Sequence, residues 1–152
     1  METLQFLDNI YFNNINKRPR INKVETIAWL NDIAGSEKLK IISLSYSFCS
    51  DEYLLEINRE HLNHDYLTDI ITFDLSDDSR LIEGDIYISI DRVRENAKQM
   101  GIGIELELKR VMAHGLLHLM GYDDKTNSGK IEMRVKEDSC LALIKNHVPR
   151  ET

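Results

Sequence analysis

The stretch "TDIITFDLSDDSRLIEGDIYISI" (Thr68–Ile90) decides the fold that this sequence predicts. Its two ends, "TDIITFDLS" and "GDIYISI", are rich in the β-branched and aromatic residues that favour strands. The polar segment "DDSRLIE" between them is typical of the connection in a hairpin. We therefore expect two strands in this stretch, paired with each other in antiparallel fashion.

Two further strands are predicted upstream of this hairpin. The segment "KIISLSYSF" (Lys40–Phe48) alternates between apolar and polar residues, as a strand with one buried face does. A short first strand is indicated by apolar and aromatic residues near the N-terminus, namely Leu4, Phe6, Ile10, Tyr11 and Phe12.

Helical spacing of apolar residues and capping residues predict helices for the rest of the chain. Their expected ranges are residues 22–35, 51–61, 91–100, 104–120 and 130–144. We expect Gly35 at a left-handed C-terminal position, and Ser50 and Asp91 as N-caps. The order of elements implies an α/β (α+β) fold, in which about five helices pack on a four-stranded mixed sheet around a single core layer.

The length and composition are those of a soluble globular protein. The chain has 152 residues, of which 42% are hydrophobic and 30% are charged, so we expect a single domain over residues 1–152. Cys49 and Cys140 lack the spacing of a metal site and are expected to be reduced thiols. The N-terminus carries acids where a signal peptide is basic, and no apolar run approaches the roughly 18 residues of a membrane span. These features predict a cytoplasmic protein.

The charge balance, taken alone, argues against a nucleic-acid partner. The formal net charge is −7, whereas proteins that bind polyanions usually present basic surface. Local basic clusters matter more than the total, and three are present. They are residues 16–23, the group Arg92, Arg94 and Lys98, and the pair Lys109 and Arg110. Taken alone, each cluster is expected to be solvated surface.

The segment "HGLLHLMGYDD" (His114–Asp124) has the spacing of a metal site. Two histidines four residues apart lie on one face of a helix, so both imidazoles can reach one cation. Gly121 can end that helix and turn the chain back, which would bring Asp124 toward the metal as a third ligand. Metzincin peptidases use this spacing with a histidine in the last position.

Two observations limit this interpretation. Histidine pairs at this spacing are also common as unrelated polar residues, although the glycine and the acid that follow favour the metal site. In H-E-x-x-H peptidases a Glu after the first His activates the water, and here that position is Gly115. We therefore do not expect peptidase chemistry of that kind.

The same segment resembles the H-G-x-L-H-L-x-G-Y-D-H motif of the YbeY family, bacterial metal-dependent endoribonucleases of ribosomal RNA maturation. "INREHLNHDYLTDIITF" and "EGDIYIS" are similar to two further family stretches, as is the Met133 to Glu137 spacing in the last helix. The resemblance spans about residues 44–140. It implies a small α/β fold, a zinc site of three ligands (His114, His118 and Asp124), single-stranded RNA as substrate, and the ribosome as partner.

The sequence departs from the family pattern at three positions. Asp124 stands where the family has a third histidine; an aspartate also ligates zinc, and its oxygen makes Mn²⁺ or Fe²⁺ conceivable as alternatives. Leu62 stands where the family commonly has an Arg that contacts RNA, and Arg59, one helical turn earlier, is a candidate to replace it. Asp74 stands where a Pro commonly follows the Phe.

Other candidate site residues have a structural alternative beside the functional one. Asn58, Thr68 and Asp69 are expected to contact substrate, whereas helix capping for Asn58 and strand-start roles for the other two are the alternatives. Glu137 is a candidate to orient a ligand histidine, or else it is an exposed acid on an amphipathic helix. Beside a metal-bound water, Arg59 and Glu137 are the two candidates for a direct catalytic role.

The leading hypothesis is a single-strand-specific, metal-dependent endoribonuclease that acts in maturation of the 3′ end of small-subunit ribosomal RNA and in ribosome quality control. Its expected partners are ribosomal RNA and the small ribosomal subunit. Two alternatives remain: a non-catalytic ribosome-assembly factor with a structural metal, and a metal hydrolase of small substrates.

Overall fold

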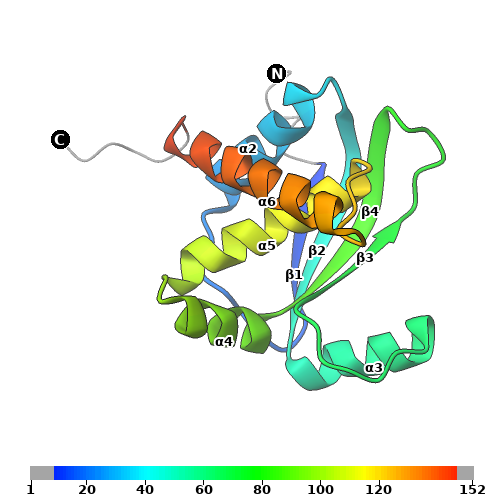
Figure 1. The fold of residues 1–152 in the computed structure, drawn as a ribbon, viewed down its shortest axis with the longest axis vertical. Coiled ribbons are helices and arrows are strands. Elements are labelled where there is room, and N and C mark those ends of the chain that lie inside the picture. The colour runs from blue at the N-terminus through cyan, green and yellow to red at the C-terminus, as the bar shows by residue number, and fades with distance from the viewer. Residues whose placement is uncertain (1–8, 147–152) are drawn as a thin grey trace.

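A four-stranded mixed sheet forms the centre of the protein, as the computed structural model shows over residues 9–146 (Figure 1). The strand order is β1 (Ile10–Asn14), β2 (Lys40–Cys49), β4 (Leu81–Ser89) and β3 (Ile70–Asp74). β1 and β4 both run parallel to β2, whereas β3 runs antiparallel to β4. The predicted hairpin and fold class are therefore confirmed, while Leu4 and Phe6 lie outside the described residues.

Five α-helices accompany the sheet within residues 9–146, in agreement with the sequence pattern. They are α2 (Lys23–Ser36), α3 (Asp51–Leu62), α4 (Ile90–Met100), α5 (Ile104–Leu119) and α6 (Asn127–Ala142). A short 3₁₀ helix, η1 (Leu143–Asn146), follows α6. In the part of the chain that the structure describes, no helix combines the length and apolar character needed to cross a membrane.

Two predicted helix ends are wrong, and each has a local cause. Gly35 lies inside α2, which continues to Ser36, and the left-handed conformation falls on Lys38 at φ 62°. Ser89, not Asp91, caps α4, because its hydroxyl accepts the N–H of Arg92 at 3.2 Å. Ser50 caps α3 as expected, and Gly101 ends α4 at φ 67°.

The side chains of β4 divide between the two faces of the sheet, as the pleat requires. Ile86 and Ile88 belong to the main core, which is completed by apolar residues of α2 and α5. Tyr87 points to the other face, where it joins a smaller cluster that contains Ile71 and Leu54 of α3. α2, α5 and α6 thus lie over one face, and α3 contacts the other (Figure 1).

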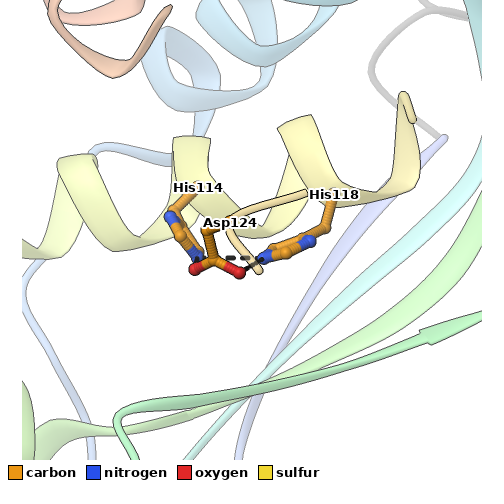
Figure 2. A group of neighbouring side chains, drawn as sticks. All are labelled: His114, His118 and Asp124. Carbon is orange, nitrogen blue, oxygen red and sulfur yellow. Dashed lines mark hydrogen bonds and ion pairs between the residues drawn. The ribbon is translucent and has the colours of Figure 1, made fainter. Parts of the chain in front are cut away.

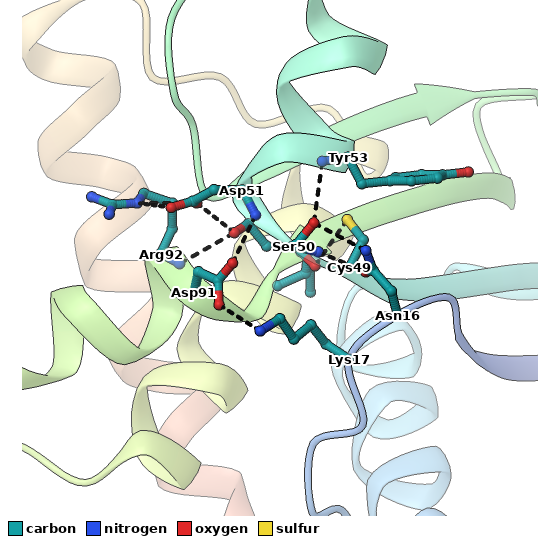
Figure 3. A network of polar contacts seen from close by, with 10 residues as sticks. Asn16, Lys17, Cys49, Ser50, Asp51, Tyr53, Asp91 and Arg92 are labelled. Atoms are coloured by element: carbon teal, nitrogen blue, oxygen red, sulfur yellow. Dashed lines mark hydrogen bonds and ion pairs between the residues drawn. The ribbon is translucent and has the colours of Figure 1, made fainter.

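A polar network joins the N-termini of α3 and α4 (Figure 3). The carboxylate of Asp91 accepts the backbone N–H of Asp51 at 2.9 Å, and the carboxylate of Asp51 accepts the hydroxyl of Ser89 at 2.7 Å. Arg92 donates to Asp51 at 3.1 Å, and Lys17 pairs with Asp91 at 3.0 Å. Acidic groups are favourable at helix N-termini, and here Asp91 of α4 supplies one to the first amide of α3, while Asp51 of α3 binds side chains at the start of α4. This network draws Asp91 away from capping its own helix.

The close contact between α5 and the β3–β4 hairpin gives a stability prediction. A Cβ atom on Gly84 would lie 2.7 Å from the Phe73 carbonyl oxygen and 2.8 Å from Leu119 Cδ1. Because a backbone oxygen cannot move aside cheaply, we expect Gly84→Ala to lower the free energy of unfolding by about 1–3 kcal/mol, measured by urea denaturation. Gly35→Ala is the matched control. Nothing lies within 4 Å of its Cβ position in α2, so equal or slightly higher stability is expected there. Equal stability of the two variants would contradict the tight packing.

Candidate metal centre

Helix α5 has one polar face, while its other faces are largely apolar. Glu107, Arg110, His114 and His118 follow one another at spacings of three and four residues, so they lie on one face of the helix. The other faces bury Leu108, Val111, Met112, Leu116 and Leu117 in the core. Packing of these apolar residues fixes the rotation of α5, and the two histidines consequently project from its polar side.

Gly121 turns the chain back toward the histidines. It has φ 106°, a conformation that L side chains rarely adopt, and its N–H donates to the carbonyl of His118 at 3.1 Å. The N–H of Tyr122 donates to the carbonyl of Leu117 at 3.0 Å, which completes the end of the helix. Asp124 then lies against both imidazoles, as the sequence spacing predicted (Figure 2).

The three side chains offer donor atoms at separations that suit one metal ion. The Nε2 atoms of His114 and His118 are 3.1 Å apart, and the Asp124 carboxylate oxygens lie 3.6 Å and 3.7 Å from them. A tetrahedral zinc ion with bonds of 2.0–2.1 Å places its ligand atoms about 3.3 Å apart. The donor set therefore fits a metal ion, and no other group of three His, Cys, Asp or Glu side chains in residues 9–146 does so.

Glu137 of α6 orients His114. Its Oε2 lies 2.6 Å from His114 Nδ1, and the side chain is only 3% exposed. Burial favours the neutral acid, yet the hydrogen bonds from His114 and Arg110 hold the pKa of Glu137 below its usual value. A carboxylate only accepts hydrogen bonds, so Nδ1 carries the proton and Nε2 presents its lone pair to the centre. The structure thus supports the orienting interpretation over that of an exposed acid.

Arg110 connects Glu137 to a second buried acid. It donates to Glu137 at 2.9 Å and to Glu107 at 2.6 Å, and Glu107 is fully buried. Burial opposes the charge on Arg110, but these two carboxylates raise its pKa above the usual value. The guanidinium of Arg110 therefore pairs with two buried carboxylates, those of Glu107 and Glu137, and Glu137 in turn contacts His114.

His118 is kept neutral by its surroundings. Burial lowers its pKa, the neighbouring His114 lowers it further, and Asp124 and Asp123 act in the opposite direction. Since a metal binds the neutral imidazole, this environment favours a ligand over an imidazolium cation.

The interpretation of Lys109 and Arg110 as a solvated basic cluster is wrong. Arg110 has 17% of its side chain exposed and lies between Glu107 and Glu137. Lys109 donates to Thr26 Oγ1 and lies 5.2 Å above the Trp29 ring, and burial lowers its pKa. The three-and-four spacing of the polar residues on α5 was the signal that could have identified Arg110.

Asp69 lies on the same side of the protein as the histidines. Its carboxylate accepts a hydrogen bond from Asn96 at 3.4 Å, and its backbone carbonyl accepts the N–H of Ser89 at 2.9 Å. Burial raises its pKa, and the proximity of His114 partly offsets this effect. Asp69 is thus within electrostatic range of the centre. A role in substrate binding stays a prediction for this residue.

The remaining predicted residues lie in and around the connection from α3 to β3. Asn58 is 1% exposed, and its side chain donates to the carbonyl of Tyr66 at 2.9 Å, so it anchors this connection and does not form a side-chain helix cap. Thr68 donates to the carbonyl of Ile70 at 3.3 Å. Arg59 pairs with Asp65 at 2.5 Å in an exposed position. Direct contact of any of these residues with substrate stays a prediction.

The family model and the named relatives that match this chain point to one family. A family model described as Endoribonuclease YbeY matches residues 8–145. A protein of Cytophaga hutchinsonii named Endoribonuclease YbeY is 58% identical over 123 residues, which cover 81% of this chain and 86% of that protein. A protein of the same name from Bacteroides thetaiotaomicron is 46% identical, with 84% and 92% covered. The solution structure of TM1509 from Thermotoga maritima superposes with a TM-score of 0.65 at 25% identity, covering 90% of this chain and 89% of that one.

The donor geometry gives a prediction for metal content. We expect protein purified from metal-replete medium to contain about one transition-metal ion per chain, measured by elemental analysis. His114→Ala removes one of three donors and should lose the ion. His61→Ala should retain it, because His61 packs its ring edge against Phe73 and is not in the donor set. A wild-type protein without metal would contradict the site.

The contact between Glu137 and His114 gives a second prediction. Glu137→Gln keeps the shape of the side chain but removes the charge that fixes the His114 tautomer. We expect zinc affinity, measured by competition with a chromophoric chelator, to fall about 10–100-fold. The neighbouring exposed acid provides the control, and Asp138→Asn should bind zinc like the wild type. Equal affinity of both variants would mean that Glu137 has only a structural role.

Proposed function

Because the chain belongs to the endoribonuclease YbeY family, we propose that it is a metal-dependent endoribonuclease that cuts unpaired RNA. The observation that carries the proposal is the convergence of His114, His118 and Asp124 donor atoms within 4.8 Å of one another, on side chains that remain partly exposed. We propose ribosomal RNA as the substrate, at the 3′ end of the small-subunit RNA. The small ribosomal subunit is the proposed partner, and the cytoplasm the proposed location, of a single domain over residues 1–152.

Zinc is the first candidate for the metal. Two imidazole nitrogens and one carboxylate oxygen are common zinc ligands, and a catalytic site keeps a fourth position open. Mn²⁺ and Fe²⁺ are the alternatives, because an oxygen ligand relaxes the preference for zinc. When bound, the ion supplies Lewis-acid activation of water and of the phosphodiester. In this donor set Asp124 is the one ligand that carries a negative charge, because His114 and His118 would bind as neutral imidazoles.

The residues around the candidate metal centre have two proposed roles, positioning of a ligand and contact with substrate. His114 is held by Glu137 with its proton on Nδ1, so Glu137 acts as a positioning residue and not as the group that touches RNA. Asp69 is within electrostatic range of His114, and Thr68 precedes it in the chain. We propose these two residues as substrate contacts.

The absence of a glutamate after the first histidine follows from packing. A Cβ atom on Gly115 would lie 2.8 Å from Ile70 Cδ1 and 3.0 Å from Ile86 Cδ1. This position of α5 therefore faces the sheet, where a carboxylate would be buried among apolar side chains. A base at this position is excluded, and the peptidase mechanism with it.

A non-catalytic assembly factor is the second candidate function. Structural zinc sites are usually closed by four protein ligands. Here the side chains of His114, His118 and Asp124 are 19%, 26% and 41% exposed, which leaves the centre accessible and favours the enzyme. A metal hydrolase of small substrates is the third candidate.

Cleavage of RNA tests the proposal. Metal-loaded protein should cut an unpaired RNA oligonucleotide, resolved on a denaturing gel, and should leave the same sequence largely intact within a duplex. Asp124→Ala should reduce the rate by at least about 100-fold, because it removes a ligand of the activating ion. Asp123→Ala is the matched control, since Asp123 is an adjacent exposed acid outside the donor set, and it should retain activity.

The other outcomes separate the three candidates. Tight RNA binding without cleavage by metal-loaded protein would favour the assembly factor. Hydrolysis of small phosphodiesters without cleavage of RNA would favour the third candidate. Equal cleavage by Asp124→Ala and Asp123→Ala would remove Asp124 from the mechanism.

A further inference from the structure

The connection between α3 and β3 presents a pair of stacked rings. The His64 and Tyr66 ring centroids are 5.1 Å apart, with an angle of 23° between the planes. The Tyr66 hydroxyl lies 3.0 Å from His64 Nδ1, which holds the two rings together. Tyr66 is nevertheless 56% exposed, and its neighbour Leu67 is 50% exposed. Adjacent exposed side chains of this kind, with two aromatic rings already stacked, offer a flat apolar surface to a ligand.

The backbone under these rings is held at several points. The buried side chain of Asn58 donates to the carbonyl of Tyr66 at 2.9 Å, and the N–H of His64 donates to the carbonyl of Asn58 at 3.1 Å. Asn63 ends α3 in the left-handed conformation at φ 57°. Asp65, which lies between His64 and Tyr66 in the chain, pairs with Arg59 of α3. The rings are therefore presented by an ordered turn, so little conformational entropy is lost when a ligand stacks on them.

The ring pair shortly precedes Asp69 and β3 in the chain, and the start of β3 packs against α5. Two residues separate Tyr66 from Asp69, so three residue steps limit the distance between their Cα atoms to about 11 Å. Asp69 is within electrostatic range of His114, and Ile70 packs against Gly115, the residue after His114. The connection leads from α3 directly into β3 beside α5 (Figure 1).

The chemistry of this segment favours a base over a phosphate. Arg59, near this segment, is already paired with Asp65, and Leu62 is an exposed apolar residue at 40%. Proteins bind unpaired nucleotides by stacking their bases on aromatic side chains, with little dependence on sequence.

We infer that His64 and Tyr66 form a base-stacking platform, on which one unpaired base of the RNA lies while the adjoining backbone reaches the metal centre. This inference rests on the proposed function. Tyr66 supplies the face that receives the base, and His64 supports it from behind. The platform selects single-stranded substrate, because a base within a duplex is not free to stack on it.

Binding of a fluorescent single-stranded RNA oligonucleotide to metal-loaded protein tests the platform. Fluorescence anisotropy is measured in the cold, with intact RNA verified on a gel. Tyr66→Ala should weaken binding about 5- to 150-fold, the range for loss of one stacked base. Tyr66→Phe keeps the ring and should bind within about threefold of the wild type.

A second exposed tyrosine provides the matched control. Tyr11 is 50% exposed on β1, at the opposite edge of the sheet from β3, and Tyr11→Ala should bind RNA like the wild type. Thermal unfolding of both alanine variants checks that the fold is kept, which is expected because Asn58 holds the backbone of residue 66 and not its side chain.

An abasic nucleotide walked along the oligonucleotide gives the decisive readout. With wild-type protein, one position should be sensitive to loss of its base. With Tyr66→Ala, that same position should become insensitive, because the two changes remove one contact. Additive losses, or unchanged RNA affinity of Tyr66→Ala, would overturn the platform and assign the exposed rings to a protein partner. Cleavage by the wild type would still uphold the proposed function in that case, whereas a wild type that neither binds nor cuts RNA would overturn both.

Discussion

At Gly84 and Gly115, helix α5 and the β3–β4 hairpin approach so closely that a side-chain carbon at either position would overlap its neighbours. This contact sets the depth and rotation of α5 on the sheet. The two histidines consequently project from the side of α5 that also carries Glu107 and Arg110, while residue 115 is turned toward the sheet. The departure from peptidase chemistry is thus a property of the packing, and the metal centre stands on the polar side that this packing leaves.

The polar side is stabilised by alternating charges. Glu107, Arg110, Glu137 and His114 form a chain of hydrogen bonds between α5 and α6, in which each buried carboxylate contacts the guanidinium. An isolated buried carboxylate would be costly, but one that is paired on both sides can stay ionised. The candidate metal centre therefore contains a histidine, His114, whose tautomer is fixed by Glu137. The negative charge of Glu137 is balanced by Arg110, which is not in the donor set.

Features with a local cause could be predicted from the sequence, and features that depend on distant contacts could not. Periodicity located the helices and the hairpin, and the spacing of His114, His118, Gly121 and Asp124 predicted how they meet, because a helix and one turn determine that geometry. Asp91 was misjudged since its partner, Asp51, lies 40 residues away. Arg110 was misjudged because its burial depends on α6, and the bond from the Asn58 side chain to Tyr66 was not foreseen because it serves a turn that follows its own helix.

The capping of α3 by Asp91 of α4 has a consequence for the order in which the chain acquires its structure. The first amide of α3 is satisfied by a carboxylate that comes 40 residues later, after β3 and β4 have been made. During synthesis at roughly 5–20 residues per second, α3 therefore remains incompletely capped for a few seconds, until β4 pairs with β2 and brings Asp91 into place. The N-terminus of the helix that precedes the stacked rings is thus fully capped only once β4 has joined the sheet.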